Sequence, residues 1–426
     1  MVKLLRRVAK DPRIQQLGPG LITGAADDDP SGIATYSQAG AQFGYSMLWS
    51  VLLTYPLMVG IQMVSARLGC ITGRGLAANV KAVFPRPVLY GIVGLLLLAN
   101  TINIAADIAA MGAALRLLVH GSAHLYSIGF GVLCLLLQVF LRYQSYVRYL
   151  KWLTLALLSY VAVVFMLHAP WSVVFSESLF PHLWLDNRAI SMVVAVFGTT
   201  ISPYMFFWQA AQEMEDLRAA GAVRPGALPP HDRATARRHL RRIRWDTYLG
   251  MGFSNLIAFC IIMSTAATLH AAGMRDIQTA AQAALALRPL GGQLAFLLFS
   301  LGIIGTGMLA VPVLAGSAAY AVAESFQWRS GLDLRLPEAR GFYALIAVAT
   351  FGGVLLNFSH IDPIRALLWS AQINGIIAVP IMAVMMLLAA RHDIMGEFVV
   401  RPRLQRLGWT ATGVMAATVL AMFLTL

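Results

Sequence analysis

The chain has 426 residues, of which 58% are hydrophobic and only 12% charged, and its mean hydropathy is +0.70. This composition excludes a soluble domain of this length and predicts that a lipid bilayer is the solvent. The formal charge of +13 does not indicate nucleic-acid binding, because the positions of the basic residues fit lipid topology better than a binding groove.

Eleven stretches of the sequence are apolar and long enough to cross about 30 Å of hydrocarbon. In chain order they fall near residues 14–42, 45–68, 87–117, 124–141, 147–168, 189–214, 246–269, 293–323, 341–357, 364–390 and 405–426. The sequence therefore predicts an all-α membrane protein with eleven transmembrane helices, organised as a single transmembrane domain over 1–426.

The Lys and Arg residues between these stretches predict the orientation. With successive connections assigned to alternate sides, 27 of the 32 basic residues fall on the side of the N-terminus. By the positive-inside rule we expect a cytoplasmic N-terminus and an external C-terminus, in a bacterial inner membrane. The long connection 215–245 carries eight arginines, so we expect a cytoplasmic basic loop that contacts lipid headgroups.

The first stretch carries acids and helix breakers at membrane depth. Three consecutive carboxylates precede a proline and a glycine, in the order Asp27, Asp28, Asp29, Pro30, Ser31 and Gly32. A helix cannot run straight through this sequence, because proline lacks the backbone donor and clashes with the preceding turn. We therefore expect two half-helices joined by a short unwound segment.

The sixth stretch carries a corresponding break, formed by Gly198, Thr199, Thr200, Ser202 and Pro203. At both breaks a residue suited to the N-cap position is followed by a proline at the first helical position. In the first stretch that cap is Asp29, and in the sixth it is Ser202.

The two broken stretches begin two sets of five, 14–168 and 189–390, and leave 405–426 as an extra helix. Because five is an odd number, the two halves are expected to have opposite orientations in the membrane. Corresponding breaks in inverted halves mark a substrate site near the midplane of a transporter. The sequence has no nucleotide-binding P-loop, so the pattern predicts a secondary transporter that works by alternating access.

The intramembrane acids have more than one interpretation. Asp29 is either only a helix cap or also a ligand of a transported cation, and we favour the cation, because three carboxylates in hydrocarbon require neutralisation. Asp27 and Asp28 either contact the same ion or line an aqueous vestibule. On the third stretch, Asn103 and Asp107 share a polar face, and we assign Asp107 to a proton or ion route.

Several motifs in the right order make the chain resemble the NRAMP family of divalent-metal transporters. Asp29-Pro30-Ser31-Gly32 and Gly40-Ala41-Gln42-Phe43-Gly44-Tyr45 are similar to the family's Asp-Pro-Gly-Asn and Gly-Ala-Gln-Phe-Gly-Tyr. Ala106-Asp107-Ile108-Ala109 and Ala371-Gln372-Ile373-Asn374-Gly375-Ile376, with Pro380, resemble motifs of the third and tenth segments. The resemblance implies the inverted-repeat fold of the leucine transporter, a divalent cation as the substrate and no cofactor.

The site itself departs from the family pattern. Gly32 stands where the family has asparagine, Ser202 replaces a methionine, Tyr204 and Gln209 replace histidines, and Ala110 replaces an acid. The loss of the soft thioether favours a hard cation held by oxygen ligands, and the loss of two side chains is expected to enlarge the site. The sequence thus resembles the related magnesium-transporting branch and predicts Mg²⁺ or Mn²⁺ as the substrate, with weak or absent proton coupling.

The candidate residues fall into three groups. The metal ligands are Asp27, Asp28, Asp29, Thr199, Ser202 and Gln209; the proton or ion pathway comprises Asn103, Asp107, Tyr204, Gln372 and Asn374; the helix breaks are Pro30, Gly32, Gly198 and Pro203. The amides of Gln372 and Asn374 alternatively only join helices. Rival functions are transport of another small solute or a monovalent ion on the same fold, and a non-transporting membrane sensor. An enzyme is not expected, because the sequence has no nucleophile–base or His/Glu metal motif.

Overall fold

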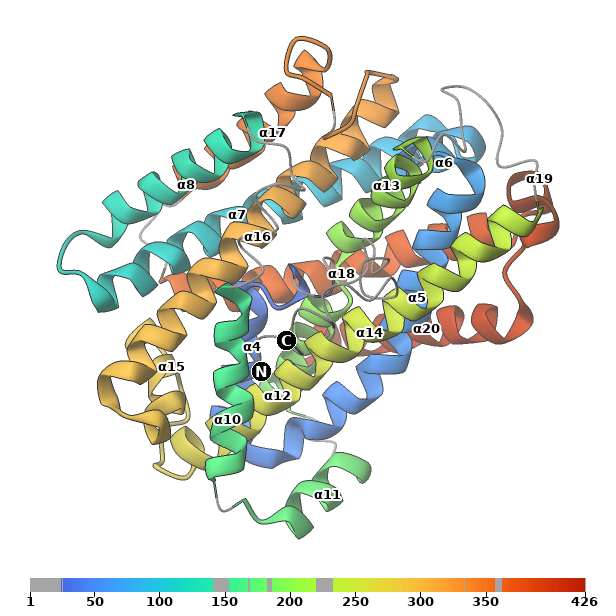
Figure 1. The fold of residues 1–426 in the computed structure, drawn as a ribbon. Helices are drawn as coiled ribbons and strands as arrows, with labels where there is room; N and C mark the ends of the chain where they lie inside the picture. The colour runs from blue at the N-terminus through green and yellow to red at the C-terminus, as the bar shows by residue number, and fades with distance from the viewer. Residues whose placement is uncertain are drawn as a thin grey trace, which may run out of the picture.

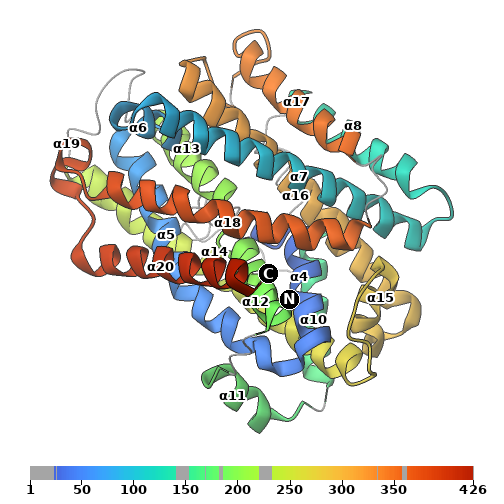
Figure 2. The same cartoon turned by 180° about the vertical axis from the view of Figure 1, so that it is seen from behind.

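The structure is a computed structural model that describes residues 24, 26–140, 153–167, 169–181, 186–219, 233–332, 334–356 and 362–425. Within these residues every regular element is a helix (Figures 1 and 2). Eight helical stretches there are long and apolar enough to cross a membrane, or nine if a bent pair around residues 155–179 forms one span. The prediction of an all-helical membrane protein is confirmed.

The helices follow one another with short connections. The N-terminal part contains α4 (Pro30–Phe43), the 3-10 helix η1 (Gly44–Met47), α5 (Leu48–Thr72), α6 (Leu76–Val83), α7 (Arg86–Leu118), α8 (Ala123–Phe140), η2 (Leu153–Leu157), α10 (Leu158–Met166) and α11 (Trp171–Leu179). The C-terminal part contains α12 (Asn187–Thr200), α13 (Pro203–Ala219), α14 (Arg233–Thr265), the π-helix η3 (Ala266–His270), α15 (Ala280–Ala284), η4 (Leu285–Leu290), α16 (Gly292–Phe326), α17 (Arg340–Leu356), α18 (Pro363–Ala389), α19 (His392–Met395), η5 (Gly396–Phe398) and α20 (Pro402–Thr425).

Each of the eleven apolar stretches overlaps a helix in the described residues. The start of the first stretch, 14–23, and residues 147–152 of the fifth lie outside them. The first two stretches form one apolar helical run, Pro30–Thr72, and α17 is a shorter apolar helix of 17 residues. The count of eleven spans and the inverted 5+5 repeat remain predictions.

The two ends of the expected basic loop at 215–245 are helical, and its middle, 220–232, lies outside the described residues, so its cytoplasmic side and its lipid contact remain predictions. Helix α13 continues to Ala219, and α14 already begins at Arg233. Arginine is a good helix former, and Arg242 on α14 pairs with two acids of α13, so the charge run is built into two packed helices. Four short helices in the connections, α6, α11, α15 and α19, were not predicted from the sequence.

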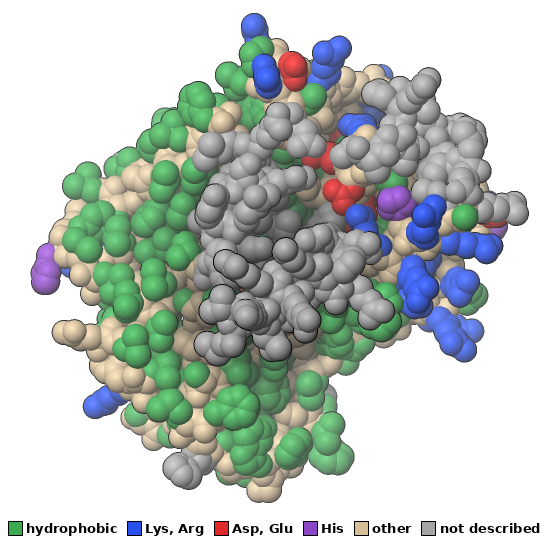
Figure 3. Space-filling model, viewed as in Figure 1, with side chains coloured by type: hydrophobic (Ala, Val, Ile, Leu, Met, Phe, Trp, Pro, Cys, Tyr) green, Lys and Arg blue, Asp and Glu red, His purple; other side chains and the backbone are tan. Residues whose placement is uncertain are grey.

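Helix α4 lies in the middle of the molecule, where it packs against α14, α18 and α12 (Figure 1). Helix α16 packs along α7, which also contacts α8 and α17, and α12 packs along α18. Hydrophobic side chains cover much of the visible surface (Figure 3), and Phe140, Phe165 and Leu424 are each at least 76% exposed. Such a surface suits contact with lipid. Polar groups at membrane depth are costly against lipid, and those described below lie in the protein interior, around α4.

Candidate functional site

The first helix break lies at Asp28 and Asp29, as predicted. Asp27 is helical, Asp28 lies in a bend, and α4 begins at Pro30. Asp29 has an extended backbone and caps α4, because its Oδ1 accepts a 2.7 Å hydrogen bond from the backbone N–H of Gly32. Proline suits the first helical position, where a backbone donor is not needed. One carboxylate oxygen of Asp29 therefore serves as the helix cap.

The second carboxylate oxygen of Asp29 faces two other helices. Its Oδ2 accepts a 3.2 Å hydrogen bond from the side-chain amide of Asn103 on α7. The hydroxyl of Tyr204, in the first turn of α13, lies 3.4 Å from the same oxygen. Asp29 is only 2% exposed, so both contacts form in the protein interior. The carboxylate thus lies where α4, α7 and α13 meet.

The second break separates α12, which ends at Thr200, from α13, which begins at Pro203. The hydroxyl of Ser202 lies 2.7 Å from the carbonyl of Thr199 and 2.9 Å from that of Gly198, so it satisfies the last turn of α12. The α13 backbone instead donates to the Ser202 carbonyl, from Met205. The interruption between the two helices falls at Ile201 and Ser202, and the Ser202 hydroxyl closes the preceding helix rather than capping the next one.

Gly198 lets α12 approach α18 closely. A Cβ atom at this position would lie 2.1 Å from the carbonyl oxygen of Ala371 and 2.5 Å from the backbone nitrogen of Gly375. Real Cβ atoms do not tolerate such distances from backbone atoms, so glycine is required for this packing. The close approach holds the end of α12, and therefore the second break, against α18.

The two breaks lie beside one another. Tyr36 on α4 and Thr200 share a 3.0 Å hydrogen bond, and the Tyr204 hydroxyl lies 3.3 Å from the carbonyl of Ala26. The expected enlargement of the site at Gly32 is not found. A Cβ atom there would already lie 3.2 Å from the Thr199 hydroxyl and 3.4 Å from the Tyr36 ring, because these side chains fill the space.

A chain of side-chain hydrogen bonds extends from Asp29 to α18. The side-chain carbonyl of Asn103 accepts a 2.8 Å hydrogen bond from Ser370, whose hydroxyl lies 3.1 Å from that of Ser31 on α4. The Ser31 hydroxyl also donates to the carbonyl of Leu367 at 3.0 Å. The sequence analysis missed Ser370, although it lies one helical turn before Asn374 in an otherwise apolar helix.

Asp27 and Asp28 share one hydrogen-bond donor on α14. The hydroxyl of Ser254 lies 2.6 Å from Oδ2 of Asp27 and 3.0 Å from Oδ1 of Asp28. The other oxygen of each carboxylate is buried and has no hydrogen-bond partner among the described residues. Both acids are at most 1% exposed, so in this conformation they do not line an open aqueous surface. Ser254, which the sequence analysis missed, is the residue that brings them together.

Asp107 lies one helical turn after Asn103 on the same face of α7. It is fully buried, and neither of its carboxylate oxygens has a hydrogen-bond partner within the described ranges. A buried carboxylate without donors is costly unless it holds a proton or meets a cation, so Asp107 fits the predicted ion or proton route.

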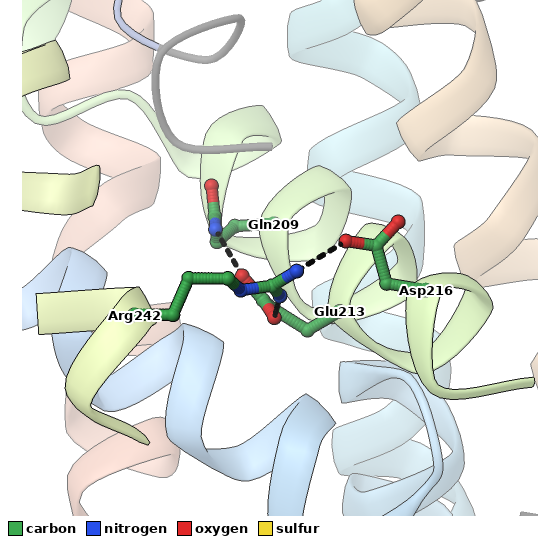
Figure 4. A network of polar contacts seen from close by, with 4 residues as sticks. All are labelled: Gln209, Glu213, Asp216 and Arg242. Carbon is green, nitrogen blue, oxygen red and sulfur yellow. Dashed lines mark hydrogen bonds and ion pairs between the residues drawn. The ribbon is translucent and has the colours of Figure 1, made fainter. Parts of the chain in front are cut away.

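Three predicted residues are not joined to Asp29 by described contacts. The amide of Gln209 donates a 3.0 Å hydrogen bond to Glu213, one turn further along α13, and Glu213 pairs with Arg242 (Figure 4). Gln209 therefore belongs to a network at the far end of α13. On α18, Asn374 is buried with its side-chain oxygen unpaired among the described residues, whereas Gln372 is only half-buried.

A cavity of about 690 Å³ leads from one end of the molecule towards Asp29. Its inner wall includes Ile33 and Ala34 of α4, Ala110 of α7 and Leu367 of α18, whose carbonyl bonds Ser31. The remaining lining comes from the last turns of α7, the start of α8, α15 with the two residues before it, α16 and the start of α18; these lining residues are Ala113, Arg116, Leu117, Ala123, His124, Gln278, Thr279, Ala280, Ala281, Ala283, Phe299, Ile303, Asp362, Pro363 and Ile364. The cavity thus borders α4 at Ile33, one helical turn after Asp29.

The arrangement has few anionic ligands at any one point. Within the described part of the chain, no group of three or more His, Cys, Asp or Glu side chains is placed to hold a metal ion. Asp29 instead has the Tyr204 hydroxyl 3.4 Å from its Oδ2, and the same hydroxyl lies 3.3 Å from the carbonyl of Ala26. One carboxylate among neutral oxygens suits a hard cation that keeps part of its water.

Comparisons with known proteins agree with this architecture. The family model described as "Natural resistance-associated macrophage protein-like" (Nramp) matches residues 20–425. The protein named divalent metal cation transporter MntH of Burkholderia ambifaria is 26% identical over 416 residues, which cover 93% of this chain and 85% of that protein.

Two solved structures share the fold. The manganese transporter of Eremococcus coleocola, in complex with an aromatic bis-isothiourea compound, superimposes with a TM-score of 0.76 at 17% identity, over 95% of this chain and 85% of that one. Mhp1, a nucleobase-cation-symport-1 family transporter in a closed conformation, gives a TM-score of 0.60 at 13% identity, over 96% and 92% of the two chains. Because the family model covers nearly the whole sequence, this chain belongs to the Nramp family.

Proposed function

We propose that this protein is a secondary transporter of divalent metal cations, with Mg²⁺ or Mn²⁺ as the substrate. The observation that carries the proposal is the position of Asp29, a buried carboxylate where two broken helices meet. Discontinuous helices at membrane depth are the usual site of substrate binding in such folds. Family membership supports the choice of substrate, since the similar MntH protein is named a divalent metal cation transporter.

The cation would bind between Oδ2 of Asp29 and the carbonyl of Ala26. The Tyr204 hydroxyl lies within 3.4 Å of both of these oxygen atoms. A position next to two oxygen acceptors also suits a hard cation, which binds oxygen ligands. The hydroxyl of Thr199, beside Gly32, adds a further oxygen. Asp27 and Asp28, which share the Ser254 hydroxyl, would then add negative charge on the α14 side of the site.

The ligand set favours a hard cation over a soft one. Oxygen donors suit Mg²⁺ and Mn²⁺, whereas a thioether selects softer metals. Ser202 stands at the position where the family pattern has methionine, and its hydroxyl donates to the end of α12. With a single carboxylate close to the ion, Mg²⁺ would keep several of its waters, as it does readily.

Alternating access would use the second half-helix, α13, as a moving part. On the end of the molecule away from the 690 Å³ cavity, Arg242 of α14 pairs with Glu213 and Asp216 of α13, the latter at 2.8 Å (Figure 4). We infer that these ion pairs hold this end closed while the cavity side is open, and that α13 must part from α14 when the ion leaves on the other side.

Proton coupling would be weak or absent. Ala110 and Gln209 stand where the family pattern has titratable groups, and the Gln209 amide donates a hydrogen bond to Glu213. Asp107 remains a buried acid near Asp29, so proton displacement by an arriving ion is compatible with the site. A proton that is only displaced does not need a relay to the other side, and we therefore expect ion flux driven mainly by concentration and membrane potential.

The test of the proposed function is uptake of Mg²⁺, Mn²⁺, Ca²⁺ and Fe²⁺ in parallel into proteoliposomes, with and without a pH gradient. We expect saturable uptake of Mg²⁺ or Mn²⁺ that changes little with the gradient. Uptake of none of the four ions, with uptake of a monovalent ion instead, would contradict a divalent-metal function.

A further inference from the structure

A second cavity, of about 510 Å³, lies at the end of the molecule where α14 begins. We call it the arginine pocket, and its lining consists of Arg67, Arg237, Leu240, Arg241, Arg244, Glu397, Phe398, Val399 and Arg401. These residues come from α5, α14, η5 and the residue before α20. Five arginines against one glutamate give the pocket a net positive charge. Figure 3 shows Lys and Arg side chains gathered at this end of the molecule.

The pocket sits at the depth of lipid headgroups. Helix α14 has 33 residues and is therefore about 50 Å long, whereas about 20 residues suffice for the hydrocarbon. Its first three turns therefore extend beyond the hydrocarbon. Arg237, Arg241 and Arg244 share one face there, and Trp245 and Tyr248, 56% and 42% exposed, continue that face. Exposed aromatic residues at this position are typical of the boundary between headgroups and acyl chains.

The arginines of the pocket outnumber its acids, since Glu397 is the one acid in the lining. The ion pairs found among the described residues join Arg242 to two acids of α13 and Arg391 to Asp393, and they include none of the five pocket arginines. Arg67, on α5, has a buried Nε that donates to no group in the described part of the chain. Arg401 lies at the N-terminus of α20, where the helix dipole also favours an anion. The pocket therefore contains one buried donor, Nε of Arg67, with no partner among the described residues, and guanidinium groups that converge from three segments.

We propose that the arginine pocket binds the phosphate group of an anionic phospholipid. Guanidinium groups match phosphate oxygens with two parallel hydrogen bonds, and several arginines beside a transmembrane helix attract anionic headgroups. Free phosphate offers the same chemistry, but Trp245 and Tyr248 on the adjoining face supply contacts that only a lipid uses. The bound lipid would link α5, α14 and the start of α20. This inference does not depend on the nature of the transported ion.

The test compares the unaltered protein, a pocket variant and a matched control variant. Each is purified in a neutral detergent and titrated with vesicle-derived phosphatidylglycerol, phosphatidylcholine or inorganic phosphate. Lipid binding is followed by native mass spectrometry and by the thermal unfolding midpoint. The pocket variant carries Arg67→Gln, Arg241→Gln and Arg244→Gln. The matched control carries Arg329→Gln, Arg335→Gln and Arg340→Gln, which removes the same charge outside the pocket.

We expect phosphatidylglycerol, but not phosphatidylcholine, to bind the unaltered protein and to raise its unfolding midpoint. The pocket variant should bind phosphatidylglycerol on the order of 100-fold more weakly, and the control should bind it nearly normally. Equal losses in the two variants would overturn the site, because net charge alone would then explain the binding. A stabilisation by inorganic phosphate that matches that of the lipid and is lost in the pocket variant would overturn the lipid as the source of the phosphate.

Discussion

Asn103 donates its side-chain amide to Oδ2 of Asp29 at 3.2 Å and accepts a hydrogen bond from Ser370 through its own oxygen. The amide therefore orients the carboxylate from α7 while α18 orients the amide. Asp29 is itself fixed at its other oxygen by the backbone of Gly32. A carboxylate held at both oxygens keeps its geometry without an ion, which reduces the cost of binding one.

Replacing Asp29 by asparagine should abolish divalent-cation binding and leave the fold intact. Asparagine also caps helices, so α4 keeps its first turn while the negative charge is lost. Alanine at this position should remove the cap as well and lower stability by about 1 kcal/mol more. The measurements are calorimetric titration with Mn²⁺ or Mg²⁺ and the unfolding midpoint. Asp393→Asn, at an exposed acid paired with Arg391, is the matched control. Wild-type uptake by the asparagine variant would disprove the site.

Ser202→Met should shift selectivity from Mg²⁺ towards Mn²⁺, Fe²⁺ or Cd²⁺, because it adds a soft ligand. The change also removes the hydroxyl bond to the end of α12, at a cost of about 1 kcal/mol. Adding Gly32→Asn should strengthen the shift only if Thr199 and Tyr36 move, since they already fill the space beside Gly32. Competition of Cd²⁺ against Mg²⁺ uptake measures the effect. An unchanged ratio in both variants would show that these positions do not line the ion path.

Metal uptake should acidify the lumen of liposomes little or not at all. The liposomes contain a pH-sensitive dye, their membrane potential is clamped, and Mg²⁺ or Mn²⁺ is added outside. Asp107→Asn should leave this small fluorescence change of the dye unaltered, because Asp107 is not expected to carry protons across the membrane. Weak or absent proton coupling would be disproved by acidification of the lumen that is proportional to metal uptake and disappears in the Asp107 variant.

Glu213→Gln should destabilise the protein by about 1–3 kcal/mol. The Glu213 side chain is fully buried, and its removal from the pair leaves Arg242 with Asp216. The Arg242 side chain is 26% exposed, so the loss should fall below the value for a fully buried pair. Arg391→Gln breaks an exposed pair and should have almost no effect. Thermal unfolding in detergent compares the two, and equal midpoints would argue against a structural role of the Glu213 pair.

The sequence predicted the helices and both breaks because these depend on local chemistry. Long apolar runs have few alternatives to helix in a bilayer, and proline after an acid or a serine ends one helix and begins another. The helices at the two ends of the basic segment 215–245 were not predicted, because they depend on contacts between α13 and α14 rather than on local chemistry. A run of arginines next to a membrane suggests a loop, yet Arg242 pairs with the buried Glu213 and the partly exposed Asp216 on α13, which the sequence does not show.

The sequence by itself thus determined that the chain is a membrane protein and which residues interrupt its helices. It also determined that Asp29 caps the half-helix beginning at Pro30. Only the tertiary structure decided which polar groups meet. Ser254 lies 227 residues from Asp27, and Ser370 lies 267 residues from Asn103, so no local pattern pairs them. Buried polar groups must find partners wherever packing brings them, and this packing joined Asp29 to Asn103, which lies 74 residues away.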